Sequence, residues 1–140
     1  MSVEAPQRRR ILVVDHDERE RIMAGRTLTE AGHAVDTAAT KADLITLLAQ
    51  HDYDLVLSDL KMPGLNGPAF YKTLKECCRG ITPPVIFSIK RGYTPEYANF
   101  LMRVAAPVLM KPMPAADLRL AVERLLPAAP APRPASSLAS

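Results

Sequence analysis

Three polar residues at the ends of apolar segments carry the chemistry that this sequence suggests. They are Asp15 after residues 11–14, Asp59 after residues 55–58 and Lys111 after residues 108–110. Short apolar runs of this kind are typical of buried strands, and parallel strands present their C-terminal ends in the crevice where open α/β sheets hold their sites. Two carboxylates held close together repel unless a cation lies between them. Mg²⁺ takes such oxygen ligands, and a nearby lysine attracts an anion such as phosphate. The three residues together predict phosphoryl transfer onto an aspartate.

The segment from Leu55 to Gly67 makes Asp59 the most informative of the three. An apolar run ends in this carboxylate, and Pro63-Gly64 then turns the chain. A carboxylate that a rigid strand presents can be a metal ligand, a general base or a nucleophile. On the residues of this segment alone, the alternative is an aspartate that caps a helix or a turn.

Composition narrows the class of protein. The chain has 140 residues, enough for one domain with a buried core. No apolar run approaches the ~20 residues that a membrane helix needs, and residues 1–10 lack the apolar centre of a signal peptide, so we expect a cytoplasmic protein. The net charge of +3 owes much to Arg8, Arg9 and Arg10, which we interpret as a solvated arm rather than a nucleic-acid surface. The adjacent Cys77 and Cys78 are either a redox pair or, as we favour, two ordinary thiols.

Strand and helix patterns alternate along the chain. Strands are predicted at residues 11–14, 34–38, 55–58, 84–89 and 108–110. Helices are predicted over 18–31, from Thr40, around Pro68, from Thr94-Pro95, and over the last apolar stripe, which ends at Leu126. This alternation predicts an α/β fold with a parallel sheet covered on both faces. We expect the domain to span 10–126, with a flexible basic arm at 1–9 and a disordered tail rich in Pro, Ala and Ser at 127–140.

Three motifs carry a resemblance to a known family. Ile-Leu-Val-Val-Asp at 11–15, Asp-Leu-Lys-Met-Pro-Gly-Leu-Asn-Gly at 59–67 and Lys-Pro at 111–112 together resemble the receiver domain of two-component response regulators. The resemblance implies a flavodoxin-like (βα)5 sandwich, doubly wound, with a five-stranded parallel sheet of strand order 2-1-3-4-5. It also implies a signalling domain that catalyses at most its own phosphorylation and dephosphorylation.

The resemblance assigns roles to individual residues. It implies that Asp59 accepts a phosphoryl group from a histidine kinase or a phosphotransfer protein, and that Lys111 contacts the acyl phosphate. Mg²⁺ would be held by Asp15, Asp59 and the backbone carbonyl of Lys61.

The loop after the first strand departs from the family pattern. The family has a second acid where this chain has His16, at a position that normally binds Mg²⁺ directly. Imidazole matches hard Mg²⁺ poorly and suits softer metals better, so we expect weaker Mg²⁺ binding. His16 is then either a metal ligand or a partly exposed loop histidine, and Asp17 is an alternative ligand if the loop rearranges.

The fourth and fifth strands depart as well. The hydroxyl residue that moves toward the phosphoryl group in the family falls at Ile89, and the aromatic switch residue falls at Val108. Ser88 points to the opposite face and would replace Ile89 only through a bulge. Lys90 is a candidate phosphoryl contact or a solvated charge. The usual coupled switch therefore cannot run through these side chains.

We expect a stand-alone receiver whose output is protein contact or phosphate relay, with no nucleic-acid or membrane partner. The expected partner face, and a possible homodimer interface, comprises the fourth helix, fifth strand and fifth helix. Its candidate residues, each of which is alternatively core packing, are Tyr93, Tyr97, Met113 and Leu118.

Two other functions stay open from the sequence. The first is a binding module of the same fold that ignores phosphate, because His16, Ile89 and Val108 all alter the activation machinery. The second is a phosphatase similar to haloacid dehalogenases, because Asp15-His16-Asp17 resembles their Asp-x-Asp start. The latter lacks the later acidic pair of that family, and Arg19 stands where Thr or Val is usual.

Overall fold

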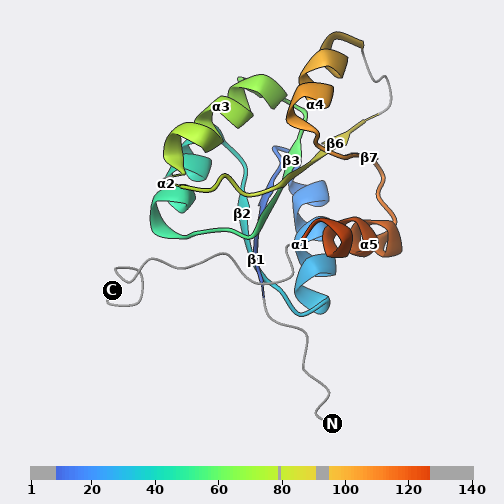
Figure 1. Cartoon of the computed structure of the whole chain (residues 1–140). Helices are drawn as coiled ribbons and strands as arrows, with labels where there is room; N and C mark the ends of the chain where they lie inside the picture. Colours follow the sequence, from blue (N-terminus) through green and yellow to red (C-terminus); the bar gives the residue numbers. More distant parts are fainter. Residues whose placement is uncertain (1–8, 79, 91–94, 127–140) are drawn as a thin grey trace.

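A five-stranded parallel sheet forms the centre of the molecule (Figure 1). The computed structural model describes residues 9–78, 80–90 and 95–126. The strands are ordered β2 (Ala34–Ala38), β1 (Arg10–Val14), β3 (Leu55–Asp59), β6 (Val85–Ile89) and β7 (Val108–Met110). All four pairings are parallel. This arrangement confirms the predicted fold class. When the five strands of this sheet are counted in chain order, β6 is the fourth and β7 the fifth, so the strand order is the predicted 2-1-3-4-5.

Helices cover both faces of the sheet (Figure 1). One face packs against α1 (Glu18–Glu30) and α5 (Ala115–Leu125), and the other against α2 (Lys41–Gln50), α3 (Gly67–Cys77) and α4 (Ala98–Val104). Successive strand residues point to opposite faces. In β1, Ile11 and Val13 accordingly join the α1–α5 core, whereas Leu12 and Val14 join the other. Because both faces of the sheet are buried, β1 and β3 are apolar along most of their length. Packing on both faces holds the C-terminal ends of these strands in place.

Side chains at the helix starts fix where the loops end. The Asp17 carboxylate accepts a hydrogen bond from the backbone N–H of Glu20 and thereby caps α1. At α2, which was predicted to begin from Thr40, the Thr40 hydroxyl accepts from the N–H of Asp43, and the Asp43 carboxylate accepts from the N–H of Ala39 rather than from that of the cap residue. Thr94, where the fourth helix was predicted to start, lies outside the described residues.

The fourth helix starts later than predicted. Pro95–Tyr97 forms a short 3₁₀ turn, η1, and the α-helix starts only at Ala98. α4 is therefore short, and no side chain caps its first turn.

The turn after Asp59 holds a small element that the sequence pattern did not predict. β4 (Lys61–Met62) and β5 (Leu65–Asn66) pair as an antiparallel hairpin. Gly64 has φ of 71° in its turn, which glycine adopts without strain. The N–H of Gly67 then bonds the carbonyl of Leu60, so the hairpin closes directly against the end of β3.

The interpretation of the arginine run as a solvated arm is wrong for Arg9 and Arg10. Arg9 is buried, and its carbonyl accepts from the N–H of Ala34. Arg10 begins β1 and pairs with the Asp36 carboxylate at 3.0 Å. Pairing with β2 therefore extends the ordered sheet to these residues. Residues 1–8 and 127–140, the rest of the predicted arm and the tail, lie outside the described part of the chain. Among the described residues, no helix combines the length and the apolar character that crossing a bilayer requires.

Candidate functional site

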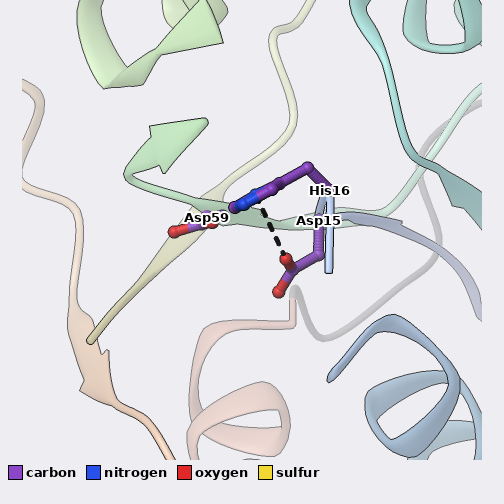
Figure 2. Close-up of side chains that lie close together, drawn as sticks. All are labelled: Asp15, His16 and Asp59. Carbon is purple, nitrogen blue, oxygen red and sulfur yellow. Dashed lines mark ion pairs between the residues drawn. The ribbon is translucent and has the colours of Figure 1, made fainter. Parts of the chain in front are cut away.

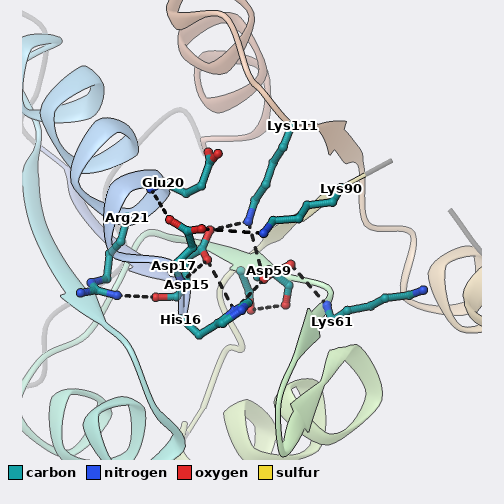
Figure 3. A network of polar contacts seen from close by, with 10 residues as sticks. Asp15, His16, Asp17, Glu20, Arg21, Asp59, Lys61, Lys90 and Lys111 are labelled. Carbon is teal, nitrogen blue, oxygen red and sulfur yellow. Dashed lines mark hydrogen bonds and ion pairs between the residues drawn. The ribbon is translucent and has the colours of Figure 1, made fainter. Parts of the chain in front are cut away.

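Asp15, Asp59 and Lys111 meet at the C-terminal edge of the sheet, as their positions in the sequence predict. All three side chains are buried. Lys111 Nζ lies 2.6 Å from Asp15 Oδ2 and 3.6 Å from Asp59 Oδ2 (Figure 3). One ammonium group thus faces two carboxylates in a region with little water, where charge interactions are stronger than at the surface.

Backbone hydrogen bonds between neighbouring strands hold these residues in position. The N–H of Asp15 bonds the carbonyl of Ala38, and the N–H of Lys111 bonds that of Ile89. Asp59 lies opposite Ser88 in the β3–β6 ladder. Each functional side chain therefore projects from backbone that the sheet has already fixed.

His16 turns toward the two carboxylates. Its Nδ1 lies 3.2 Å from Asp59 Oδ2 and 3.8 Å from Asp15 Oδ1, and 39% of its side chain is exposed (Figure 2). Candidate ligand atoms of these three residues all lie within 4.8 Å of one another. The histidine is thus partly exposed, as one interpretation predicted, and it also faces the acids, as the other required.

Asp17, the alternative ligand, has another role in this structure. Its hydrogen bond from the backbone of Glu20 holds the pKa of the Asp17 carboxyl below its ordinary value, and the charge of Lys90 acts in the same direction. Lys90 Nζ lies 3.7 Å from Asp17 Oδ2, and 58% of its side chain is exposed (Figure 3). Asp17 therefore caps α1, and Lys90 lies at the rim of the site.

Lys61 and Arg21 make two further contacts with the site. Of these two residues, only Lys61 was expected from the sequence. The backbone N–H of Lys61 donates to Asp59 Oδ1 at 3.3 Å, while the Lys61 side chain extends away toward Glu96 and the ring of Tyr97. Arg21 was not predicted: its guanidinium donates to the carbonyl of Asp15 at 2.8 Å. The contact joins residues six apart across the start of α1, and no residue pattern in the sequence indicates it.

The switch positions hold apolar side chains, as the sequence implies. Ile89 is buried at the end of β6, and Val108 lies partly exposed on β7. Ser88 cannot take the place of Ile89, because β6 pairs residue by residue with both neighbouring strands and the described ladders contain no bulge.

The expected partner face needs one correction. Leu118 is fully buried between α5 and α1, so its role is core packing. Met113 packs against the same core, whereas Tyr97 packs against the core of the other face. Tyr93 lies outside the described residues. The exposed apolar side chains on this side of the molecule are Met102, Val108, Met110 and Leu120.

A family model described as the response regulator receiver domain matches residues 11–123. The chain belongs to this family. Over 125 residues it is 31% identical to the transcriptional regulatory protein TcrA of Mycobacterium tuberculosis, covering 89% of this chain and 49% of TcrA. Over 113 residues it is 36% identical to the sensory/regulatory protein RpfC of Xanthomonas campestris pv. campestris, covering 78% of this chain and 15% of RpfC. The chain thus spans half or less of the length of these relatives.

The fold is similar to that of solved single-domain receivers. The chemotaxis protein CheY4 of Vibrio cholerae matches with a TM-score of 0.75 and 27% identity, over 86% of this chain and all of CheY4. The receiver family implies a signalling domain of two-component systems rather than a classical enzyme, which does not favour the phosphatase interpretation.

Receiver domains usually bind Mg²⁺, and the donor atoms of this site can be compared with the needs of that ion. The oxygens of Asp15 and Asp59 suit Mg²⁺, which takes oxygen ligands in near-octahedral geometry. The imidazole nitrogen of His16, which lies 3.2 Å from Asp59 Oδ2, does not suit Mg²⁺. The donor set of this chain therefore fits Mg²⁺ poorly.

Proposed function

We propose that this receiver domain accepts a phosphoryl group on Asp59 from a histidine kinase or a phosphotransfer protein. The observation that carries the proposal is the position of Asp59: a buried carboxylate at the end of β3, with Lys111 Nζ 3.6 Å from its Oδ2. Membership of the two-component receiver family supports the choice of donor. We place the phosphoacceptor unit within residues 10–126.

Phosphoryl transfer to Asp59 uses a nucleophile and a positive charge beside it. A carboxylate oxygen of Asp59 attacks the phosphorus of a phosphohistidine, a P–O bond forms and the P–N bond breaks, and the electron pair leaves with the imidazole nitrogen. Negative charge gathers on the phosphoryl oxygens during transfer. The Lys111 ammonium is fixed by Asp15 beside the acceptor, so it stabilises this charge without first having to move.

We propose that the phosphorylated domain signals through contacts with partner proteins. Phosphorylation adds about −1.5 to −2 charges at the edge of the sheet, and partner proteins that prefer one state respond to it. We propose that the contact face includes α4, β7 and α5, where Met102 and Met110 expose apolar side chains. A second copy of this chain is one candidate partner.

Intact-mass spectrometry after incubation with a small acyl phosphate tests the phosphoacceptor. We expect one added phosphoryl group on the unaltered chain in the presence of a divalent metal, and none on Asp59→Asn. Asp54→Asn is the matched control, because Asp54 is also buried and immediately precedes β3, at the end opposite to Asp59. Circular dichroism verifies that each variant is folded.

A folded protein that gains no phosphoryl group with any divalent metal would contradict the proposal. The result would favour the phosphate-independent binding module, the candidate supported by the apolar residues Ile89 and Val108 at the switch positions. An adduct that persists in Asp59→Asn would assign the phosphoryl group to another residue.

A further inference from the structure

We propose that this site binds a divalent transition-metal ion in preference to Mg²⁺, with Nδ1 of His16 as a ligand beside Asp59 and Asp15. The inference rests on the proposed function, because it concerns the metal of the same site. It differs from that function in naming which class of ion the chain selects, and the reason is a residue particular to this chain.

The spacing of the donor atoms suits direct binding by His16 and Asp59. Two atoms bound to one ion at about 2.0 to 2.2 Å lie roughly 3 Å apart. Nδ1 of His16 and Oδ2 of Asp59 are 3.2 Å apart, so both can bind one ion with the side chains as they lie (Figure 2). Asp15 Oδ1, at 3.8 Å from the same nitrogen, needs only a small rotation or a bridging water.

The three candidate ligand atoms lie within 4.8 Å of one another. Lys111 donates to Oδ2 of Asp15, and the backbone N–H of Lys61 donates to Oδ1 of Asp59. The other oxygen of each carboxylate contacts His16. Of these two oxygens, Asp15 Oδ1 also accepts from the N–H of Asp17, and Asp59 Oδ2 also lies 3.6 Å from Lys111 Nζ. Asp17, which would add a third carboxylate, is held as the cap of α1. Three residues thus offer one nitrogen and two oxygens.

The chemistry of this set selects among metals. Imidazole nitrogen binds zinc, copper, nickel and iron well, whereas Mg²⁺ prefers carboxylate, carbonyl and water oxygens. Zn²⁺ accepts histidine nitrogen and aspartate oxygen together in one small site. An imidazole in place of an acid therefore strengthens binding of a transition metal relative to Mg²⁺.

Titration calorimetry at one fixed pH measures the selectivity directly, without any phosphodonor. The parent protein carries Cys77→Ser and Cys78→Ser, because adjacent thiols offer Zn²⁺ a competing site. We expect Zn²⁺ to bind the parent more tightly than Mg²⁺. Because loss of a group that merely hydrogen-bonds to a ligand already lowers metal affinity about 10- to 100-fold, His16→Asp should lower the Zn²⁺-to-Mg²⁺ affinity ratio at least about tenfold.

The matched control is His51→Asp, the same change at the C-terminal end of α2 and outside the cluster. It should leave the affinity ratio of the parent unchanged. A second measurement uses the chain with both cysteines intact: Co²⁺ should shift the ring-proton NMR signals of His16, and the other two histidines should show no comparable shift.

An affinity ratio that His16→Asp leaves unchanged, or that His51→Asp changes equally, overturns the inference, as do unshifted His16 ring protons with Co²⁺ bound. These outcomes are separate from failure of the proposed function. Selective metal binding without any phosphoryl adduct removes the phosphoacceptor role and keeps the metal site. A Mg²⁺-dependent adduct on Asp59, with no effect of His16→Asp on selectivity, does the reverse.

Discussion

Two polar networks of this molecule differ in how their charges are matched. On β1 and β2, the Asp36 carboxylate receives the guanidinium of Arg10 at 3.0 Å and the hydroxyl of Tyr53 at 2.8 Å. At the edge of the sheet, one lysine serves both Asp15 and Asp59. The first network joins one cation to one anion, whereas the second holds one lysine for two carboxylates.

This difference in charge balance indicates which of the two networks can bind a ligand. A matched network gains little from a further ion, so its contribution is to the stability of the fold. An excess of carboxylate is destabilising unless a cation is added. In the functions that we propose, the Asp15–Asp59 pair provides both the attraction for a metal and the nucleophile.

The largest effect should come from Lys111→Met, which removes the one lysine or arginine side chain that contacts both acids among the described residues. Breaking a buried pair by removing one partner is destabilising by about 3 kcal/mol or more, so the free energy of unfolding in urea without metal should fall by this order. Adding Asp15→Asn to the same variant should recover much of the loss, because one of the two repelling charges is gone. No loss in Lys111→Met would mean that the two networks do not differ as described.

A second variant, Ile89→Thr, adds a hydroxyl to the edge of the site. Ile89 is 3% exposed, so losing buried methyl groups and burying a polar atom should lower the free energy of unfolding by about 1 to 3 kcal/mol. If the apolar residue is what disconnects the site from β7, phosphorylation should shift the amide NMR signals of Val108–Met110 more in the variant than in the unaltered chain. Equal shifts would show that transmission does not use this position.

Tyr53→Phe tests the matched network. Loss of the hydrogen bond to Asp36 should lower the free energy of unfolding by about 1 kcal/mol, with phosphorylation of Asp59 unchanged. Burial, and next the hydrogen bond to Asp36, raise the pKa of Tyr53 above its ordinary 10.0. The unfolded chain therefore releases this proton first, so this stabilisation is complete below pH 10 and is lost as pH rises further.

The measurement is urea unfolding of both proteins between pH 8 and 11, an interval of about one pH unit or more on either side of an ordinary tyrosine pKa. The unaltered chain should lose stability more steeply than Tyr53→Phe at the alkaline end. Parallel curves would assign the alkaline loss to other groups.

The smallest effect is expected for Lys90→Ala. Its contact with Asp17 lies at the surface, where solvent screens the charges and ion pairs contribute little. The urea midpoint should not change measurably, and the rate of phosphorylation should fall far less than in Lys111→Met. A loss as large as that of Lys111→Met would instead make Lys90 a direct contact of the phosphoryl group.

Local signals were sufficient for most elements of the fold. The apolar runs at 11–14 and 55–58 alternate between two buried faces, and the capping of α2 by Thr40 involves residues three apart. Such signals failed where the determinant lay elsewhere. The β4–β5 hairpin depends on closure of Gly67 against Leu60, and Arg9 is buried because β2 pairs beside it.

By itself the sequence determined the parallel α/β fold and the three strand-end residues of the site, because apolar periodicity and turn residues are local properties. Only the tertiary structure decided that His16 faces Asp59 while Asp17 caps α1, and that Lys111 reaches Asp15 across 96 residues of sequence. These contacts depend on the side-chain directions that strand pairing and the helix cap impose. No residue pattern specifies the contacts of His16 and Lys111, because their distances are set by segments that lie far apart in the chain, whereas the cap is local and its sequence signal became clear only once the end of the loop was placed.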